Sequence, residues 1–252
     1  WKERTRAGYT WQEWLQEYEI VDSAFDGMPV YGEDFSYDFH VSSDKKPEWN
    51  PEFPIVRGWD VGLAAEAMAC VFTQLVPPSR VFVYHELTAS DLDVEHFVPE
   101  VKMMSNEWFP SATRFFDIVD PTCFNRNQID KRRAAELIRD GLHTKPIPGI
   151  ASIIDRRRAV TRFLKENRRG QPALVISTDA KMVIEGFIGG YHYAFSKFGQ
   201  LKSEPEKNEY SHIHDALQYV CTRILGLDTG NKKKGLVIPA PKYNFSYPSV
   251  RG

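Results

Sequence analysis

The chain has 252 residues, of which 42% are hydrophobic, and its formal net charge at pH 7 is −2. This length and apolar content suffice for a substantial core in one large domain or two small ones. No apolar run reaches the ~18 residues of a membrane span, and Trp1, followed by charged residues, resembles neither a signal peptide nor an initiator methionine, so we expect a fragment without a membrane partner. Cys70, Cys123 and Cys221 lie among apolar residues and are odd in number, which favours buried reduced thiols in an intracellular protein.

The first half of the chain predicts a connecting region and then a β-rich unit. Residues 1–52 are rich in turn formers after a short helical stretch, and we expect them to wrap the unit that follows. Three β-like runs predict a meander, and they cover residues 55–62, 67–76 and 80–87. Ser90 is the predicted N-cap of a helix that Pro99 kinks or divides. Residues 113–120 predict a fourth strand.

The second half alternates helices and strands. Gly141 and Gly170 are the predicted ends of two helices, and residues 172–177 predict a short buried strand. Asp179 and Ser211 are the predicted N-caps of the last two helices. This order predicts an α/β domain over residues 53–227, with a mixed sheet and helices on both faces. A Pro-rich tail over residues 228–252 is expected to be extended or docked on a neighbour.

Two aspartates stand at the ends of predicted strands. Asp60 ends the first strand between Gly58 and Gly62, and Asp120 ends the fourth. If these strands are parallel neighbours, both carboxylates lie at the carboxyl-end crevice, where open α/β sheets bind ligands. Asp215 lies off the apolar stripe of the final helix, where we expect water to reach it. Asp215 would complete the cluster if this helix points at the crevice, and a partner for the helix dipole is the alternative reading.

Three carboxylates at one crevice would require cations, because like charges raise one another's pKa. Oxygen ligands favour Mg²⁺ or Mn²⁺, and two such ions ~3.5–4 Å apart would activate a water molecule and stabilise the leaving oxygen of a phosphodiester. Asp117 competes with Asp120 for the ligand role, and a structural acid within the strand is the favoured interpretation of Asp117.

The stretches that carry these residues resemble the nuclease domain of the large terminase subunit of tailed bacteriophages. The resemblance covers residues 27–227 and includes RGWDVG and VDPTC and, more specifically, GFIGGYHYAF and EPEKNEYSHIHDALQY. It implies a ribonuclease H-like mixed sheet, a three-strand meander plus parallel strands, of the kind shared with Holliday-junction resolvases and integrases. It also implies that Asp60, Asp120 and Asp215 bind two divalent cations, with Glu66 as an auxiliary ligand.

The resemblance implies a Mg²⁺- or Mn²⁺-dependent endonuclease that cuts concatemeric double-stranded DNA during viral packaging in the host cytoplasm. Its implied partners are an upstream ATPase motor domain, the portal and the small terminase subunit. No G-x-x-x-x-G-K-[ST] motif occurs in the chain, so the motor is expected upstream of residue 1. A junction resolvase or integrase-type nuclease, and a non-catalytic DNA or portal docking module, are the alternatives.

Further residues are predicted to support this site. His212 and His214 are expected to orient the metal ligands or to serve the structure, because a two-metal site generates its own hydroxide. Residues 126–169 contain thirteen basic and five acidic residues and could face phosphates, although solvated helix faces are the alternative. The arginines predicted to contact DNA are Arg132, Arg133, Arg156, Arg157 and Arg158.

Overall fold

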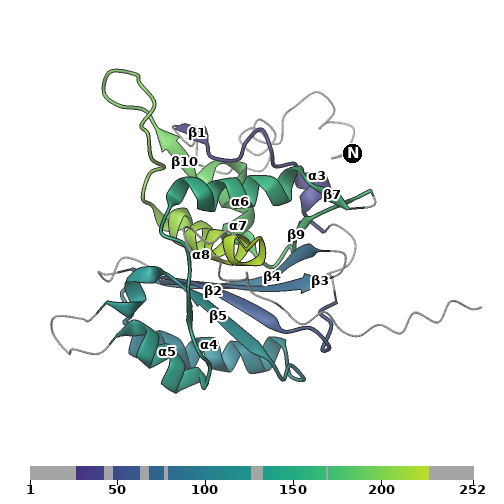
Figure 1. Ribbon diagram of the computed structural model, residues 1–252. Coiled ribbons are helices and arrows are strands. Elements are labelled where there is room, and N and C mark those ends of the chain that lie inside the picture. The colour runs from purple at the N-terminus through teal and green to yellow at the C-terminus, as the bar shows by residue number, and fades with distance from the viewer. Residues whose placement is uncertain are drawn as a thin grey trace, which may run out of the picture.

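A computed structural model describes residues 27–42, 48–62, 68–76, 79–125, 133–168 and 170–226. The predictions for residues 1–26, for Glu66 and Arg132, and for the tail at 228–252 therefore lie outside the described residues. A sheet of six strands separates two helical layers (Figure 1). In spatial order its strands are β6 (Ile147–Pro148), β5 (Phe115–Val119), β2 (Ile55–Val61), β3 (Met68–Val76), β4 (Arg80–Ala89) and β9 (Leu174–Ile176).

The sheet is mixed, as the sequence predicted. Strands β2, β3 and β4 form an antiparallel meander, and β5 pairs in parallel with β2, so the first and fourth predicted strands are neighbours. Strand β6 continues the sheet in parallel beside β5, and β9 pairs in parallel with β4.

Helices cover both faces of the sheet (Figure 1). Helices α4 (Val94–Trp108) and α5 (Ala134–Leu142) lie on one face, and α6 (Ile153–Lys165), α7 (Lys181–Glu185) and α8 (Glu209–Ile224) lie on the other. The smaller elements are β1 (Gly27–Pro29), which pairs with β10 (His192–Ala194), α3 (Tyr37–His40), the 3-10 turn η1 (Pro121–Phe124), the π-helical turn η2 (Gly186–Gly190), and the hairpin of β7 (Asn167–Arg168) and β8 (Gln171–Pro172). None of the helices within the described ranges has the length and apolar character needed to cross a membrane.

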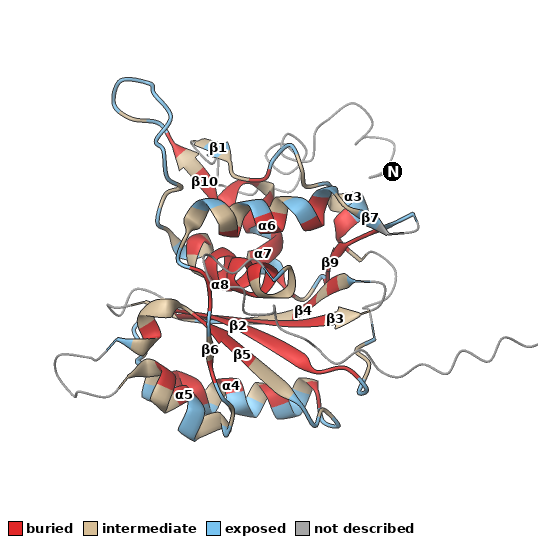
Figure 2. Ribbon diagram, viewed as in Figure 1, coloured by how far each residue is buried: buried red, intermediate tan, exposed pale blue. Residues whose placement is uncertain are grey.

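Two hydrophobic cores, one on each face, follow from the alternation of side chains along the strands. Val56 of β2 packs in the core beneath α6 and α8, whereas Ile55 and Trp59 pack in the core above α4 and α5. Figure 2 shows that α8 is buried along most of its length, because it lies between the sheet and α6. Cys70, Cys123 and Cys221 are buried free thiols, as predicted.

The helix starts differ from those that the sequence predicted. Asp93, and not Ser90, caps α4, and its Oδ1 accepts the N–H of His96 at 2.9 Å; Pro99 lies inside this helix without dividing it. Asn208, three residues before Ser211, caps α8 in a reciprocal capping box. Three-residue errors of this kind arise because several turn formers near one helix start can each supply a capping oxygen.

The start of α7 receives its cap from another element. Ala180, rather than Asp179, occupies the N-cap position and makes no side-chain cap. The carboxylate of Glu86 on β4 accepts the N–H groups of Met182 at 2.6 Å and Val183 at 2.9 Å. Burial raises the pKa of Glu86 to about 7 even though these two hydrogen bonds lower it. A cap provided by a neighbouring strand leaves no local pattern in the sequence.

Two glycines predicted to end helices have other roles. Helix α5 continues to Leu142 and ends at His143, whose φ of 55° is left-handed. Gly141 lies inside α5, where a Cβ would overlap with Cγ1 of Val98, so it permits the close contact with α4. Helix α6 ends at Lys165, and Gly170, with a φ of +79°, forms the turn of the β7–β8 hairpin.

Gly58 sets the distance between β2 and α8. A Cβ on Gly58 would overlap with the backbone oxygen of Ala216 and would lie 2.6 Å from Cγ2 of Val220. A backbone atom cannot rotate away as a side chain can, so a larger residue at position 58 must push the helix off the sheet. Asp60, two residues along the same strand, faces the same helix.

We therefore expect Gly58→Ala to lower the free energy of unfolding by about 1–3 kcal/mol, the range for overpacked cores. Alanine has a better strand propensity than glycine, so propensity alone predicts that Gly58→Ala stabilises the strand. A loss of stability would therefore reflect the close contact between β2 and α8. Urea unfolding followed by circular dichroism measures the difference. A variant as stable as the wild type would contradict the close β2–α8 contact.

Candidate metal centre

The parallel pairing of β2 and β5 places Asp60 and Asp120 side by side. Trp59 is registered against Val119, and the N–H of Asp120 donates to the carbonyl of Trp59 at 3.1 Å. The residues that follow Trp59 and Val119 are Asp60 and Asp120, which therefore lie side by side. Both residues follow the alternation that places Val56 and Ile118 in the core on the α8 side.

Asp215 reaches this position from α8. It is the seventh of the sixteen residues of the helix and is only 4% exposed. The sequence led us to expect that water reaches Asp215, because it lies off the apolar stripe. That expectation is wrong because α6 packs against α8 and covers the surface that a single amphipathic helix would leave in water.

The carboxylate of Asp60 is destabilised by its surroundings. Burial raises its pKa, the hydrogen bond with His212 lowers it, and the negative charges of Asp215 and Asp120 raise it further, with a net increase. Nδ1 of His212 lies 2.8 Å from Oδ2 of Asp60. The three aspartates thus lie close enough to affect one another electrostatically, although they are separated by 60 and 95 residues in the chain.

Asp120 is held in place through both oxygens. Oδ1 accepts the N–H of Thr122 at 2.6 Å, which caps η1, and Oδ2 accepts the hydroxyl of Tyr219 at 2.8 Å. Tyr219 lies on α8, one helical turn after Asp215, so α8 carries Asp215 and contacts both other aspartates, Asp120 through Tyr219 and Asp60 through His212. Its hydroxyl stays protonated, because burial raises the pKa of Tyr219 well above its usual value.

Two cations of the protein neutralise Asp215. Nη1 of Arg156 on α6 lies 3.3 Å from Oδ1, and Nζ of Lys207 lies 2.6 Å from Oδ2. The guanidinium of Arg156 also lies over the ring of Tyr219, with its Cζ 4.6 Å from the ring centroid. Nε and Nη1 of Arg156 are buried and have no hydrogen-bond partner among the described residues.

The structure separates Arg156 from the arginines with which the sequence grouped it. Arg156 is 5% exposed, whereas Arg158 is exposed and Arg157 is half-buried over the ring of Tyr193. The sequence contained a pattern that indicates the burial of Arg156, because this residue is in phase with the buried stripe of α6, which includes Ala159, Val160 and Phe163. Lys207, in contrast, was missed because its contact with Asp215 depends on the path of the chain before α8.

The remaining predicted residues fall in different layers. Arg133 occupies the N-cap position of α5, on the opposite face of the sheet from α6, so the basic segment is divided between two layers (Figure 1). His214 is fully buried; its Nε2 lies 3.2 Å from the carbonyl of Val183, its ring stacks on Tyr191, and burial lowers its pKa to about 3. His214 is therefore a neutral core residue.

Asp117 faces away from the other three aspartates. Asp117 lies three residues before Asp120. Because side chains alternate along a strand, Asp117 faces the other side of the sheet, in the core above α4 and α5. Its oxygens accept from Nε of Arg57 at 2.7 Å, from Nη2 of Arg57 at 2.8 Å and from the indole N–H of Trp59 at 2.8 Å. The geometry favours Asp120 over Asp117 as a ligand, because the oxygens of Asp117 are bonded within the opposite core.

The donor set has the chemistry that Mg²⁺ and Mn²⁺ prefer, namely carboxylate oxygens with excess negative charge. Within the described ranges, however, no group of three or more His, Cys, Asp or Glu side chains is arranged to hold a metal ion. The reason is visible in the contacts, since the carboxylate oxygens are directed at His212, Tyr219, Arg156 and Lys207. The three aspartates offer oxygen ligands of the kind that divalent cations prefer, and these contacts would have to be released before the oxygens could bind one.

The fold, in which β5 extends the meander of β2, β3 and β4 in parallel and α8 covers it, resembles that of a solved large terminase nuclease domain. The fold resembles that of the nuclease domain of the large terminase of bacteriophage SPP1, solved with bound Mn, at a TM-score of 0.51 and 15% identity over 78% of this chain and 98% of that one. The large terminase nuclease of thermophilic phage G20c, with bound cobalt, aligns at a TM-score of 0.49 and 12% identity over 77% of this chain and 97% of that one. No family model and no curated protein sequence matches the chain.

Proposed function

We propose that the chain is the nuclease domain of a viral large terminase and that it hydrolyses phosphodiester bonds of concatemeric double-stranded DNA. One observation carries this proposal: Asp60, Asp120 and Asp215, from three separate elements, converge at one end of β2 and β5, where the charges of Asp215 and Asp120 help to raise the pKa of Asp60. Arg156 and Lys207 lie beside Asp215, yet the pKa of Asp60 remains raised, so further cations would stabilise the cluster. The likeness to the SPP1 domain, which was solved with bound Mn, supports divalent ions as those cations.

Asp60, Asp120 and Asp215 would hold the ions, and Glu66, which lies outside the described residues, would be an additional ligand. Two Mg²⁺ or Mn²⁺ ions would activate a water molecule and stabilise the leaving oxygen. His212 orients Asp60, and Tyr219 orients Asp120, through hydrogen bonds of 2.8 Å each.

DNA binding is assigned to basic residues near the cluster. Arg158 is exposed on α6, and Arg157 lies beside it. Arg133 would contact the DNA backbone from the other layer, and Arg132, which lies outside the described residues, is proposed as a further contact. If these residues contact phosphates, the affinity for DNA falls steeply as salt increases. An upstream ATPase domain, the portal and the small terminase subunit complete the proposed machinery.

The test is nicking of supercoiled plasmid by the wild-type chain in Mn²⁺, Mg²⁺, Ca²⁺ or EDTA. We expect conversion to open-circular and linear DNA in Mn²⁺ or Mg²⁺ and none in EDTA, because the cluster alone cannot activate water. Branched DNA of equal length distinguishes a junction resolvase, for which linear duplex would be a poor substrate. Cleavage by the folded chain in EDTA would contradict the proposal. So would a folded chain that fails to cut DNA with any of the metals tested.

A further inference from the structure

Lys207 occupies an unusual position for an exposed lysine. It precedes Asn208, the N-cap of α8, and its side chain is 67% exposed. Its ammonium nevertheless lies 2.6 Å from Oδ2 of Asp215, whose side chain is only 5% exposed. The cation thus reaches from the solvent to a buried carboxylate of the metal centre.

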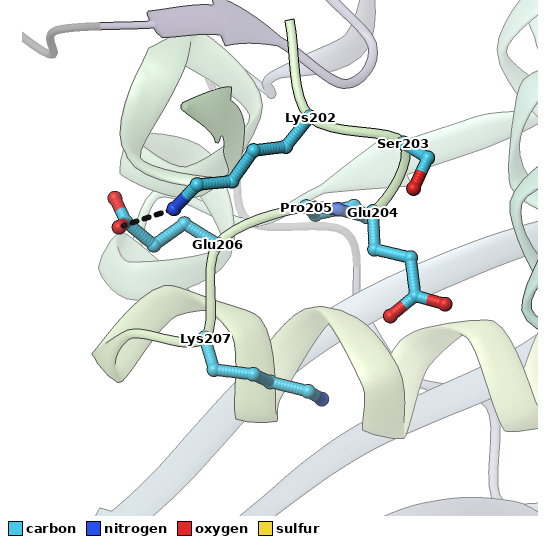
Figure 3. A pocket seen from close by; sticks show the side chains of 6 residues that line it. All are labelled: Lys202, Ser203, Glu204, Pro205, Glu206 and Lys207. Atoms are coloured by element: carbon cyan, nitrogen blue, oxygen red, sulfur yellow. Dashed lines mark ion pairs between the residues drawn. The ribbon is translucent and has the colours of Figure 1, made fainter. Parts of the chain in front are cut away.

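The chain next to Lys207 is anchored by Asn208, whereas the side chain of Lys207 is mostly exposed and is held only at its ammonium. Nδ2 of Asn208 donates to the carbonyl of Gly190 at 2.8 Å, and its Oδ1 accepts the N–H of Ser211. These bonds fix where the lysine begins. Figure 3 shows its side chain extending along α8, at the edge of an open hollow lined by residues 202–207.

Arg156 and Lys207 neutralise the same carboxylate in different ways. Arg156 is buried, stacked on Tyr219 and planar, so it has little freedom to leave Asp215. Lys207 loses side-chain entropy when it reaches Asp215, and an ion pair of an exposed lysine typically contributes only ~0–1 kcal/mol. Glu204 and Glu206, two further carboxylates, also line the hollow beside Lys207 (Figure 3).

We propose that Lys207 is an exchangeable counter-ion that competes with the divalent cation for Asp215 and so sets the metal concentration at which the centre loads. This inference rests on the proposed metal-dependent function. Without metal, the ammonium stabilises the excess negative charge of the cluster. A divalent cation brings twice the charge and displaces the ammonium, while Arg156 remains in place and holds Asp215 in position.

The test is Mn²⁺ affinity, measured by isothermal titration calorimetry on the whole chain at constant ionic strength. Lys207→Met keeps most of the length of the side chain and removes its charge, and we expect it to bind Mn²⁺ up to about fivefold more tightly, as the loss of a competing ion pair of this strength would produce. Lys202→Met is the matched control: Lys202 lies on the same segment but pairs with Glu206 at 3.8 Å, so its affinity should equal that of the wild type.

Asp60→Asn identifies which binding belongs to the centre. Loss of Mn²⁺ binding in Asp60→Asn would show that the wild-type binding belongs to the metal centre. If Lys207→Met then binds Mn²⁺ no more tightly than the wild type, the competition is refuted and the metal centre stands. If neither the wild type nor Lys207→Met shows Mn²⁺ binding that depends on Asp60, both the metal centre and the inference are overturned. Circular dichroism of each variant verifies the fold.

Discussion

Replacing Asp60 or Asp215 with asparagine is expected to lower Mn²⁺-dependent plasmid cleavage by about a thousandfold. Each substitution removes one negative charge from the cluster while keeping the shape of the side chain. The ions then lose a charged ligand, and electrostatic stabilisation by metal contributes several kcal/mol to such reactions, each 1.36 kcal/mol being a factor of ten in rate. Initial nicking rates of supercoiled plasmid, compared at saturating Mn²⁺, measure the effect.

The matched control is Asp140→Asn, which removes the same charge from an exposed residue of α5 that pairs with Arg139. Its cleavage rate should be within twofold of the wild-type rate. A rate for Asp60→Asn and Asp215→Asn within tenfold of the wild type would place the active site elsewhere in the chain.

Loss of cleavage in Asp60→Asn should not arise from unfolding. The pKa of Asp60 is raised in the folded protein, so its contribution to stability is complete below the unfolded pKa and is lost as the pH rises through the folded one. At neutral pH the ionised carboxylate is therefore unfavourable in the folded state without metal. We expect Asp60→Asn to melt at the same temperature as the wild type or higher in EDTA, a common consequence of removing a functional charge.

Arg57→Met is expected to lower the free energy of unfolding by about 3–5 kcal/mol, because it leaves the carboxylate of Asp117 buried without its charge partner. Arg57 donates twice to Asp117 and once, at 2.9 Å, to Oγ of Ser105, and its side chain is 3% exposed. Methionine fills much of the same volume, so the lost charge, rather than a cavity, dominates the expected effect. Urea unfolding measures it.

A second substitution separates the buried charge from general damage to the core. Arg57→Met combined with Asp117→Asn removes the unpaired charge yet keeps an oxygen for the indole of Trp59, and should recover part of the stability. Arg139→Met, which breaks the exposed pair with Asp140, should cost less than about 1 kcal/mol. A double variant less stable than Arg57→Met would contradict this account of Asp117.

The network around Asp117 also explains how two aspartates three residues apart on one strand acquire different roles. Asp117 and Asp120 have opposite phases in a strand, so one faces the α4 side and the other faces α8. The sequence favoured Asp120 only because it ends the strand. The partner of Asp117, Arg57, lies 60 residues away, and it is the parallel register of β2 and β5 that pairs them.

The amino-acid sequence by itself determined the meander, its parallel neighbour and the position of two acids, although it did not predict β6. Alternating apolar residues predicted the meander, and the strand after the first long helix is the parallel neighbour of β2. Asp60 and Asp120 follow from these patterns because a strand end is a local property. Periodicity also placed the apolar stripe of α8, although it did not fix the first residue of the helix.

Only the tertiary structure decided what surrounds Asp215. Whether an off-stripe residue meets water depends on which elements pack over its helix, and α6 buries it. The contacts of Arg156 and Lys207 with Asp215, of Tyr219 with Asp120, and of Glu86 with the start of α7 each join elements distant in the chain or turned by a loop. Local propensity carries no information on such contacts, because they arise only when strands and helices assemble into layers.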